Sequence, residues 1–488
     1  MARRAAGRFV GWFRPDRDSS KGTLQDQLYA AIRQAALQGE LSAGERLPSS
    51  RALAADLGLG RNTVVAAIER LVAEGYLTSR RGAGLFVAAD LPAEGVARAP
   101  AVGSPARPPI LSRRSAAAPG LHAEGESDVS RPFALGAAAL DAFPLETWRR
   151  LAVQTLRRRP ADLLGYGDRR GLPALRRALA TYLADSRGVV CSPETIVIVS
   201  GAQQALDLIA RLLLDPGDAV VVEDPGYVGA RDALASAGAR LVPIAVDDQG
   251  LDPALLAAIN PAPKLAMLTP SHQFPLGMTL PVARRLALLA EARARGIWIV
   301  EDDYDCEYRY GGPPLQSLQG LDGGERVLYV GTFSKVLFPG LRLGYVVLPA
   351  QLVDGFLRLK AAADGFSPGW PQTILAEFIA EGHLVQHIRR MRVLYRRRRM
   401  ALLAAIQRHA GDLLLPRLSE AGLHVALEFR DDRDDRMAAA AAKAAGLVVA
   451  PLSRYAVARR LSGLLLGFAA FPEAELEAAV QRLARALR

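Results

Sequence analysis

Short apolar runs alternate with helical patterns from residue 131 to about residue 350. The runs include TIVIVSG, AVVVEDPGY, LAMLTPSHQ, GIWIVEDDYD, RVLYVGTFSK and LRLGYVVLP, and two of the helical segments between them are GAQQALDLIARLLL and LPVARRLALLAEARARG. This alternation is typical of an α/β fold with a mostly parallel sheet covered on both faces. Beyond residue 350, long helices and then short strands indicate a smaller α+β lobe. We therefore expect one domain at 131–488, with a large lobe at about 160–350 and a small lobe at about 351–488.

The segment at 20–89 has a different pattern. LQDQLYAAIRQAALQG and LPSSRALAADLG predict two helices, the second with Ser49 or Ser50 as its N-cap and Gly58 as its C-terminal stop. GLGRNTVVAAIERLVAEG predicts a turn and a third helix, and YLTSRRGAGLFVA predicts two short strands joined by a glycine-containing turn. This is the order of a winged helix-turn-helix, so we expect the segment to bind double-stranded DNA.

Composition predicts a linker, a basic net charge and a cytoplasmic location. Residues 90–130 are rich in Ala, Pro, Gly and Ser and lack apolar periodicity, which indicates a flexible linker. The formal net charge of +11 permits an anionic partner without identifying one. Cys191 and Cys306 match no metal motif and are expected to be free thiols in a reducing cytoplasm. No run of about 18 apolar residues is present, so we expect no membrane span and no membrane partner.

Polar and basic side chains gather at the start of the third predicted helix, from which a recognition helix reaches base edges in the major groove. Arg61 can donate two hydrogen bonds to a guanine, and Asn62 can pair with an adenine edge. The arginine on the preceding helix and the basic hairpin can contact phosphates. The candidate DNA-binding residues are Arg51, Arg61, Asn62, Thr63, Arg80, Arg81 and Gly82.

Lys335 follows the apolar run RVLYV in a polar loop, at a strand end where α/β sheets bind ligands. Hydroxyl groups and a guanidinium fork flank it, and SGAQQALDL supplies backbone N–H groups at a helix N-terminus; together these suit a phosphate dianion. No GxxxxGK[ST] motif is present, so this lysine is not that of a P-loop. The candidate phosphate ligands are Ala202, Gln203, Thr332, Ser334 and Arg342.

Three further side chains end predicted strands. Asp302 can hold a ring nitrogen protonated, Tyr304 can hydrogen-bond a ring oxygen, and Tyr227 can stack on a flat ring. Together these features describe a pocket for pyridoxal 5′-phosphate (PLP): a phosphate-binding site, an acid for a ring nitrogen, a stacking aromatic and a lysine that forms imines.

Two sets of motifs resemble known families. GERLPSSRALAADLGLGRNTVVAAIERLVAEGYL and RRGAGLFV resemble the GntR-type winged helix, although Val65 stands where many members have a further DNA-contacting arginine. YGDRRGLPALRRALA, SGAQQALDL, EDPGYVGAR, TPSHQFPLG, EDDYDCEY and TFSKVLFPGLRLGY resemble the fold-type-I aminotransferases. In combination the chain resembles the MocR family, also called the GabR/PdxR group, except in its first twenty residues and its linker.

The resemblance implies a role for each motif residue. Lys335 would form the internal aldimine with PLP. Asp302 would pair with the pyridine nitrogen, Tyr304 with the phenolic oxygen, and Tyr227 would lie against the ring. The phosphate would be held by Ala202, Gln203, Thr332, Ser334 and Arg342.

The resemblance also implies a homodimer, in which Tyr166 would reach the phosphate of the partner subunit. His272 or Gln273 would replace the asparagine that aminotransferases usually place beside the ring. Arg454 is the candidate for binding a substrate carboxylate. Gly229 stands where GABA-responsive relatives carry an arginine, which argues against GABA as the effector.

The order of head, linker and aminotransferase-like domain favours a transcriptional regulator that senses PLP, an amino compound or both. An amine entering the pocket would displace Lys335, and this exchange would bias a two-state arrangement that the DNA-binding heads report. Two alternatives stay open: a functional aminotransferase with an appended head, and a DNA-binding protein whose large domain no longer binds PLP. The sequence leaves enzymatic activity undecided.

The segment RRMRVLYRRRRM at 389–400 places arginines around all faces of a predicted helix. This distribution favours a solvated helix or intersubunit ion pairs. A basic surface for DNA is the alternative.

Overall fold

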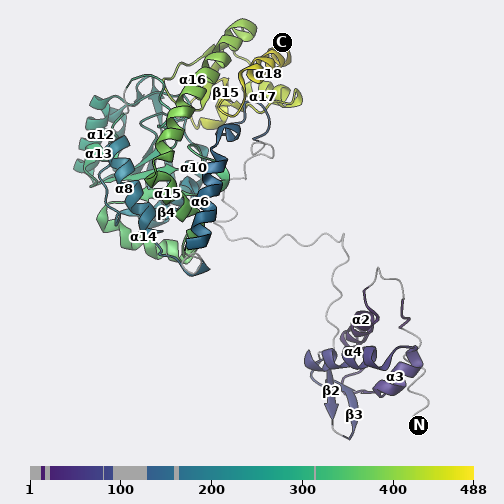
Figure 1. Cartoon of the computed structure of the whole chain (residues 1–488). Coiled ribbons are helices and arrows are strands. Elements are labelled where there is room, and N and C mark those ends of the chain that lie inside the picture. Colours follow the sequence, from purple (N-terminus) through teal and green to yellow (C-terminus); the bar gives the residue numbers. More distant parts are fainter. Residues whose placement is uncertain (1–12, 17–21, 81, 92–128, 159–163, 313–314) are drawn as a thin grey trace. The chain divides into compact units, whose positions relative to one another are not determined.

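The computed structural model describes residues 13–16, 22–80, 82–91, 129–158, 164–312 and 315–488. The chain divides into two compact units, residues 1–110 and 111–488, and each unit is described by itself (Figure 1). The boundary lies within the segment that the sequence predicts to be a linker.

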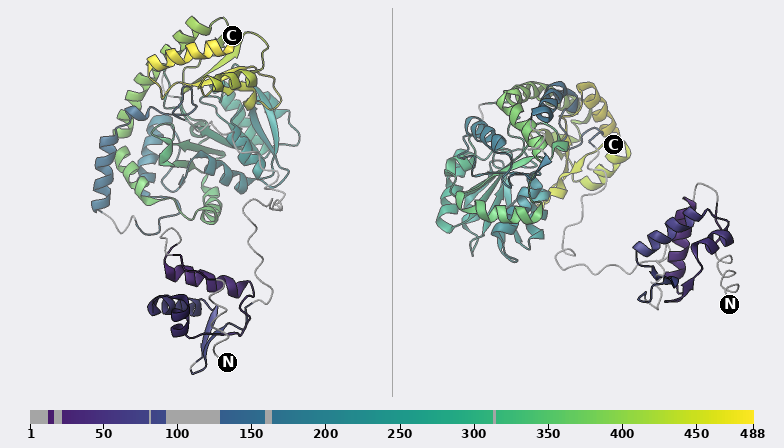
Figure 2. Two further views of the ribbon diagram at one scale, coloured as in Figure 1. Left: turned by 90° about the vertical axis from the view of Figure 1, so that its right-hand side faces the viewer. Right: turned by 60° about the horizontal axis from the view of Figure 1, so that its bottom comes forward.

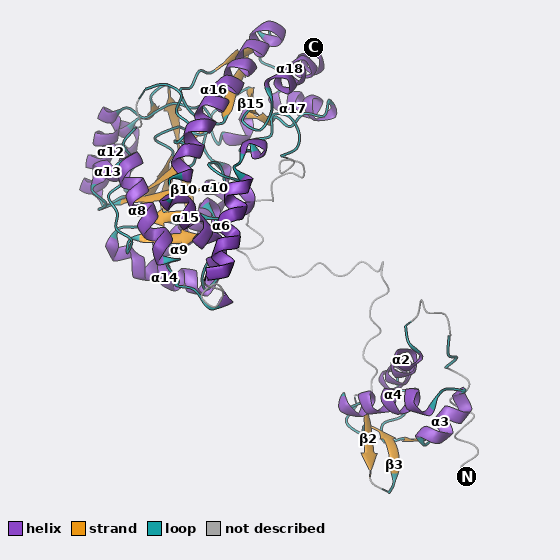
Figure 3. Cartoon of the chain, in the orientation of Figure 1, coloured by secondary structure: helices purple, strands orange, loops and turns teal. Residues whose placement is uncertain are grey.

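The described part of the N-terminal unit contains three helices and a three-stranded antiparallel sheet of order β1-β3-β2 (Figure 3). The hydroxyl of Ser49 accepts the Ala52 N–H and caps α3, which ends at Gly58 with φ 61°, so the predicted cap and stop are confirmed. The predicted hairpin is β2–β3, and β1 is an additional strand. The elements are α2 (Leu24–Leu37), β1 (Arg46–Leu47), α3 (Ser50–Leu57), α4 (Arg61–Ala73), β2 (Leu77–Arg80) and β3 (Gly84–Val87).

One hydrophobic core holds these elements together. Each helix contributes one apolar stripe, and Leu28, Leu53 and Val64 are fully buried. Because the stripe of α4 faces inward, the polar residues at its N-terminus stay at the surface, and Arg61 and Asn62 are exposed.

The C-terminal unit is built on an eight-stranded sheet of order β4-β11-β10-β9-β8-β5-β6-β7. Six strands run in one direction, whereas β11 and β7 are antiparallel to their neighbours. β5 and β10 are buried along their whole length, as expected for strands covered on both faces. The predicted α/β fold with a mostly parallel sheet is confirmed. The strands are β4 (Ile196–Val199), β5 (Ala219–Asp224), β6 (Arg240–Asp247), β7 (Gly250–Leu251), β8 (Leu265–Leu268), β9 (Trp298–Asp303), β10 (Val327–Thr332) and β11 (Gly344–Val347).

Helices cover both faces of this sheet (Figures 1 and 3). On one face α9, α10 and α14 pack against residues such as Val197 and Val330. On the other face α6, α8, α12 and α15 pack against the alternate positions, such as Ile198 and Ile299. The helices are α6 (Leu145–Arg158), α8 (Pro173–Arg187), α9 (Ala202–Leu213), α10 (Val228–Ser236), α11 (Pro253–Ala257), α12 (Val282–Arg295), α13 (Leu318–Asp322), α14 (Ala350–Ala363) and α15 (Gly369–Ala380), with short 3₁₀ turns η2 (Leu140–Ala142) and η3 (Pro339–Leu341).

The small lobe combines a four-stranded antiparallel sheet of order β12-β13-β15-β14 with three helices, and the C-terminal helix lies against the long α16 (Figure 2). Its core also contains Phe133, from the start of the domain. The expected lobe boundary near residue 350 differs from the structure, because Phe356 of α14 and Phe378 of α15 pack against the large sheet. The elements are α16 (His383–Ala410), β12 (Leu414–Pro416), β13 (His424–Phe429), α17 (Asp435–Ala444), β14 (Ala450–Pro451), η4 (Leu452–Tyr455), β15 (Gly463–Gly467) and α18 (Glu473–Leu487).

The carboxyl ends of the parallel strands meet at one edge of the large sheet. Asp302 of β9 stands opposite Val330 of β10, and β8 and β5 continue the parallel ladder. Loops that follow neighbouring parallel strands lie side by side, which is where such sheets bind ligands. The loops in question follow β4, β5, β8, β9 and β10.

Candidate functional site

Lys335 lies in the loop after β10 and is mostly buried. Its Nζ donates a hydrogen bond to the backbone oxygen of Gly136 at 3.3 Å. Burial lowers the pKa of Lys335, while the charges of Asp305 and Asp302 act in the opposite direction. A lysine with a lowered pKa loses its proton more readily, and the uncharged amine is the nucleophilic form.

Gly136 is a site residue that the sequence analysis missed. Its φ is 67°, and a Cβ built on it would lie 2.0 Å from Nζ of Lys335. Only glycine leaves room for the lysine at this distance. The surrounding sequence FALGAAAL carries no signal for this role, because the contact joins residues 199 positions apart.

Asp302 is a buried carboxylate, 4% exposed, whose Oδ1 has no hydrogen-bond partner in the described part of the chain. Burial raises its pKa to about 7, and the charges of Asp303 and Asp305 add to the effect. The neighbouring carboxylates have partners: Asp303 pairs with Arg187 at 2.7 Å, and Glu301 accepts two backbone N–H groups at the start of α13. The acidic cluster is therefore not a solvated face, and Asp302 carries an oxygen that suits an N–H donor.

Tyr304, His272 and Asp305 form a hydrogen-bonded cluster beside Asp302. Nδ1 of His272 lies 2.9 Å from Oδ1 of Asp305 and 2.9 Å from the Tyr304 hydroxyl. His272 is 3% exposed, and its Nε2 has no hydrogen-bond partner among the described residues. The structure therefore brings His272 to Tyr304.

Gln273 has a different function in the structure. Its Nε2 donates to the backbone oxygens of Pro225 and Phe274 at 2.8 and 2.7 Å, and its Oε1 accepts the Leu276 N–H at 3.1 Å. These bonds fix the loop after β8 and occupy the side-chain amide. Of the two alternatives that the sequence left open, His272 is the one that contacts Tyr304.

Tyr227 precedes α10 at the end of β5, and its ring lies edge-on to Phe274 with centroids 5.8 Å apart. Burial and the charge of Asp302 raise the pKa of Tyr227 to about 12. Phe274 also contacts Tyr304 at 5.8 Å and Tyr455 at 5.1 Å. Phe274 thus joins the aromatic residues into one cluster, a role that the motif TPSHQFPLG does not reveal.

Gly229 stands beside this cluster. A Cβ at this position would lie 2.6 Å from both the Tyr227 hydroxyl and Oε1 of Gln203. Gln203 in turn donates to the backbone oxygen of Gly229 at 2.9 Å. The site therefore has no room for a larger residue at 229 unless Tyr227 or Gln203 moves.

The candidate phosphate site forms where β4, β11 and β10 adjoin. Gly201, with φ 126°, precedes α9, whose first N–H groups have no partner within the helix. The guanidinium of Arg342 lies 3.7 Å from the position of a Cβ on Gly201. The side chain of Arg342 makes no hydrogen bond or ion pair with the described residues, and the residue adopts an unusual φ of 51°. Thr332 ends β10, and its hydroxyl accepts the Ser334 N–H at 3.2 Å.

Two candidates lie apart from this group. Tyr166 is 96% exposed, and its ring contacts Phe366 at 5.7 Å. Arg454 belongs to η4, and its backbone oxygen accepts a hydrogen bond from Arg231 at 3.0 Å. The next residue in the chain is Tyr455, whose ring packs against Phe274.

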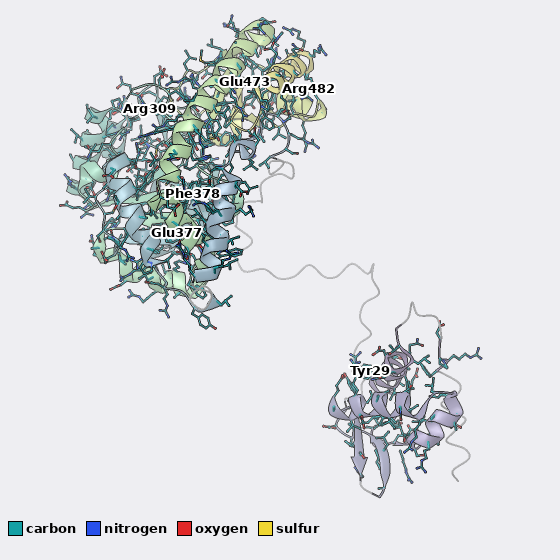
Figure 4. The ribbon with its side chains drawn as sticks, viewed as in Figure 1. Tyr29, Arg309, Glu377, Phe378, Glu473 and Arg482 are labelled. Atoms are coloured by element: carbon teal, nitrogen blue, oxygen red, sulfur yellow. The ribbon has the colours of Figure 1, made fainter. Side chains whose placement is uncertain are left out.

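The candidate DNA interface is on the N-terminal unit. Arg51, Arg61 and Asn62 are exposed, and their side chains make no hydrogen bond or ion pair with the described residues. By contrast, Arg70 pairs with Glu74 at 3.0 Å and lies over the Tyr29 ring, which Figure 4 labels. Arg51 and Arg61 are thus unpaired cations at the starts of α3 and α4.

The wing adds further groups. Arg80 lies over the Phe86 ring at 5.0 Å, and Gly82 turns the hairpin with φ 79°. Arg81 lies outside the described residues. Thr63 is half-buried beside the α4 N-terminus. Arg46 on β1 lies within 3.1 Å of the position of a Cβ on Gly84 and is an exposed cation that the sequence analysis missed, since a two-residue strand has no detectable period.

Most arginines of the run on α16 bind groups of their own subunit. Arg398 and Arg399 donate to the backbone oxygens of Ala469 and Ser419, each at 2.5 Å. Arg396 donates to the backbone oxygen of Tyr310. Arg397 pairs with Glu473 of α18, labelled in Figure 4, and Arg392 donates to the backbone oxygen of Glu307 at 2.5 Å. These bonds join α16 to the rest of the domain, although Arg389, Arg390, Arg396 and Arg397 remain exposed.

Two further findings concern metal ligands and membrane spans. Among the described residues, no group of three or more His, Cys, Asp or Glu side chains is placed to hold a metal ion, and both cysteines are free thiols. No helix in the same part of the chain combines the length and hydropathy needed to cross a membrane.

Comparison with protein families matches both units. Residues 24–87 match the model for bacterial regulatory proteins of the gntR family. Residues 132–483 match the model for aminotransferases of class I and II. The first range contains the helix-turn-helix and the wing, and the second contains both lobes of the C-terminal unit.

Individual relatives match most of the chain. The chain is 42% identical to a probable rhizopine catabolism regulatory protein, MocR, of Rhizobium meliloti, over 93% of this chain and 91% of the relative. It is 40% identical to the transcriptional regulator TauR of Rhodobacter capsulatus, over 79% and 80% of the two chains. Among solved structures, it is similar to LysN, the α-aminoadipate aminotransferase of Thermus thermophilus, with a TM-score of 0.72, 29% identity and coverage of 77% and 97%. The chain therefore belongs to the MocR-type helix-turn-helix transcriptional regulators, which join a GntR-type DNA-binding head to an aminotransferase-like domain.

Proposed function

We propose that the C-terminal domain of this regulator binds PLP and that the affinity of the head for DNA depends on the state of that site. When bound, PLP supplies an aldehyde that reacts reversibly with primary amines and a ring that accepts electrons. The observation that carries the proposal is the buried Oδ1 of Asp302, which has no hydrogen-bond partner in the described chain and lies in the same site as Lys335. A protonated ring nitrogen is the kind of group that would satisfy this oxygen.

The residues of the site fit the parts of PLP. Lys335 would bond to the aldehyde carbon, Tyr304 would donate to the ring oxygen, and Tyr227 would face the ring. Ala202, Gln203, Thr332, Ser334 and Arg342 would hold the phosphate. The structure of LysN contains N-(5′-phosphopyridoxyl)-L-leucine, which supports the same class of ligand here.

A homodimer follows from the same proposal. The ring of Tyr166 is almost wholly exposed, which suits a side chain that reaches the phosphate of the partner subunit. Two heads carried by one dimer would favour paired DNA half-sites. As a DNA-binding regulator the protein would act in the cytoplasm.

The effector would be PLP itself or an amino compound that competes with Lys335 for the aldehyde. Arg454 is the proposed partner for a carboxylate on such a compound. The loop that carries it is fixed by the large domain, since Arg231 binds the backbone oxygens of Arg454 and Tyr455. Asp224 accepts the N–H groups of three successive residues, 457 to 459, at 2.7–2.9 Å. Because glycine stands at 229, the proposal excludes an arginine-bound carboxylate at that position.

A DNA-binding assay tests the coupling. Fluorescence anisotropy with the protein's own promoter region would compare PLP-loaded and PLP-free protein, for wild type and for Lys335→Ala. Lys264→Ala is the matched control, because Lys264 is exposed on the surface. We expect PLP to change the affinity of wild type and control by about 5- to 150-fold, the usual range for coupling between two sites. Affinity that is the same in every sample would reject the coupling.

A further inference from the structure

His272 connects the proposed PLP site with the small lobe. On one side, its ring lies 5.8 Å from the Tyr304 ring at an interplanar angle of 33°. On the other side, it lies 5.3 Å from the His424 ring at 37°. His424 belongs to β13, so the imidazole contacts both a strand of the small lobe and the tyrosine of the proposed cofactor site.

The ring of His272 also requires glycine at position 422. A Cβ on Gly422 would lie 2.0 Å from Cε1 of His272, and the φ of Gly422 is 91°. Ser419 donates to the backbone oxygen of Gly277 at 2.9 Å and ties the same part of the small lobe to the loop after β8. Any shift of the small lobe along this contact would therefore move the imidazole.

The hydrogen bonds of Nδ1 fix the tautomer. An ionised carboxylate only accepts hydrogen bonds, so Nδ1 must carry the hydrogen that it shares with Asp305. The Tyr304 oxygen, 2.9 Å from the same Nδ1, then also accepts, and its own hydroxyl proton stays available for another acceptor. In the neutral imidazole Nε2 then carries no hydrogen, and in the described structure it has no partner.

We propose that Asp305 and His272 are a positioning pair, which directs the hydroxyl proton of Tyr304 toward the cofactor, and that the small lobe controls this pair through Gly422 and His424. This inference rests on the proposed binding of PLP. His272 would thus act through Tyr304 and not by touching the ring. The arrangement gives the small lobe a direct effect on the electronic state of the cofactor, in addition to any effect on access to the site.

The consequence is a measurable change at the Lys335 nitrogen. A hydrogen bond from Tyr304 draws negative charge away from the ring oxygen of the cofactor. A weaker bond leaves more charge near the Lys335 nitrogen, which then holds its proton to higher pH. The titratable and charged groups that face His272 and Tyr304 are Asp302, Asp303, Asp305, Glu223, Lys335, His424, Arg399 and Arg417.

A double-mutant cycle on the purified, PLP-loaded full-length protein tests the proposal. The measurement is the pH midpoint of the absorption change of bound PLP. We expect His272→Phe to raise the midpoint by about 0.5–1 unit, the size of one neutral hydrogen bond. Tyr304→Phe is expected to raise it at least as much, and the double variant should match Tyr304→Phe alone. Additive shifts, or no shift in His272→Phe, would overturn the proposal.

Conservative variants separate positioning from packing. His272→Asn places an amide N–H near the position of Nδ1 and should keep the wild-type midpoint. In Asp305→Asn, the new amide N–H can donate to Nδ1 and so favours the tautomer with hydrogen on Nε2. Nδ1 then also accepts the Tyr304 hydroxyl proton, which draws that proton away from the cofactor. We therefore expect a higher pH midpoint for this variant. A midpoint for His272→Asn equal to that of His272→Phe would contradict the hydrogen-bonding role.

The contribution of the small lobe is tested with a pair of glycines. Gly422→Ala is expected to raise the midpoint as His272→Phe does, because the new Cβ displaces the imidazole. Gly446→Ala is the matched control: its φ of 77° gives similar backbone strain, but only the end of the Arg482 side chain lies within 4 Å. Equal midpoints for the two alanine variants would remove the small lobe from the proposal.

Histidine-selective nitrogen NMR of the PLP-free protein distinguishes failure of this inference from failure of the proposed function. The His272 signal, assigned by its loss in His272→Asn, should report hydrogen on Nδ1, and Asp305→Asn should move it to Nε2. If wild type shows no PLP absorption while the tautomer is as expected, PLP binding is wrong and the Asp305–His272 pair stands. If PLP binds but hydrogen is on Nε2, the positioning pair is wrong.

Discussion

Asp302→Asn is expected to stabilise the PLP-free protein at neutral and alkaline pH, although it should impair PLP binding. The pKa of Asp302 is raised from 3.8 to about 7, chiefly by burial. A carboxyl group with a raised pKa contributes stability that is fully present below its unfolded pKa. That stability is lost as the pH rises through the folded value. The amide has a similar shape and no charge, so the variant avoids this loss.

The size of the effect follows from the shift. About 3 pKa units correspond to about 4 kcal/mol of unfolding free energy above pH 7. Roughly two of these units lie between pH 5 and pH 7, so the advantage of the variant should grow by about 3 kcal/mol between pH 5 and pH 8. Asp303→Asn is the matched control. Asp303 pairs with Arg187 and accepts from Tyr329, so its loss should destabilise the protein at both pH values, by about 3–5 kcal/mol.

Urea unfolding of PLP-free protein, followed by tryptophan fluorescence, measures these differences. Trp298 begins β9, the strand that ends with Asp302 and Asp303, and so reports on this region. Added PLP should stabilise wild type and have little effect on Asp302→Asn. A difference between variant and wild type that is the same at pH 5 and pH 8 would refute the argument from buried charge.

Three further outcomes are expected. Gly136→Ala should abolish the absorption band of bound PLP because its Cβ occupies the position of the lysine amine, whereas Gly369→Ala, with nothing within 4 Å of its Cβ, should retain the band. In gel-shift titrations, Arg61→Ala should weaken specific DNA binding by about 10- to 100-fold, the effect of losing one base contact. Arg33→Ala, which removes a side chain bonded to Tyr76, should leave specific DNA binding unchanged. Arg398→Ala should lower the thermal stability of the C-terminal domain, because it leaves the Ala469 oxygen unpaired. Its affinity for DNA should be unchanged. A lower DNA affinity of the folded variant would support the alternative that α16 forms a basic surface for DNA.

The local elements were predictable because their signals are local. Ser49 and Gly58 bound α3 through a side-chain cap and a left-handed residue, and both are visible in the sequence. The alternation of apolar runs and helical patterns likewise predicts the large sheet. The division between lobes was less accurate, since the apolar faces of α14 and α15 fit either lobe by pattern alone.

The candidate site likewise combines residues that the sequence could single out with contacts that it could not predict. Motifs singled out Lys335, Asp302, Tyr304 and Arg342 as candidates, since polar residues at or near the ends of apolar runs are conspicuous. Periodicity and spacing do not show which member of an acidic cluster lacks a partner. Asp303 has partners because Tyr329 and Arg187, the latter more than one hundred residues earlier in the chain, reach its carboxylate, whereas no such group reaches Oδ1 of Asp302.

The two domains, the order of their elements and the residue types available for phosphate, ring and DNA contacts follow from the amino-acid sequence, because caps, turns and apolar periods act over a few residues. Only the tertiary structure places Gly136 opposite Lys335, leaves room for the His272 ring at Gly422, and shows that most arginines of the α16 run bind their own chain. These contacts join distant segments through the order of the strands and the packing of the small lobe. Their distances depend on how whole elements pack, which no short stretch of sequence encodes.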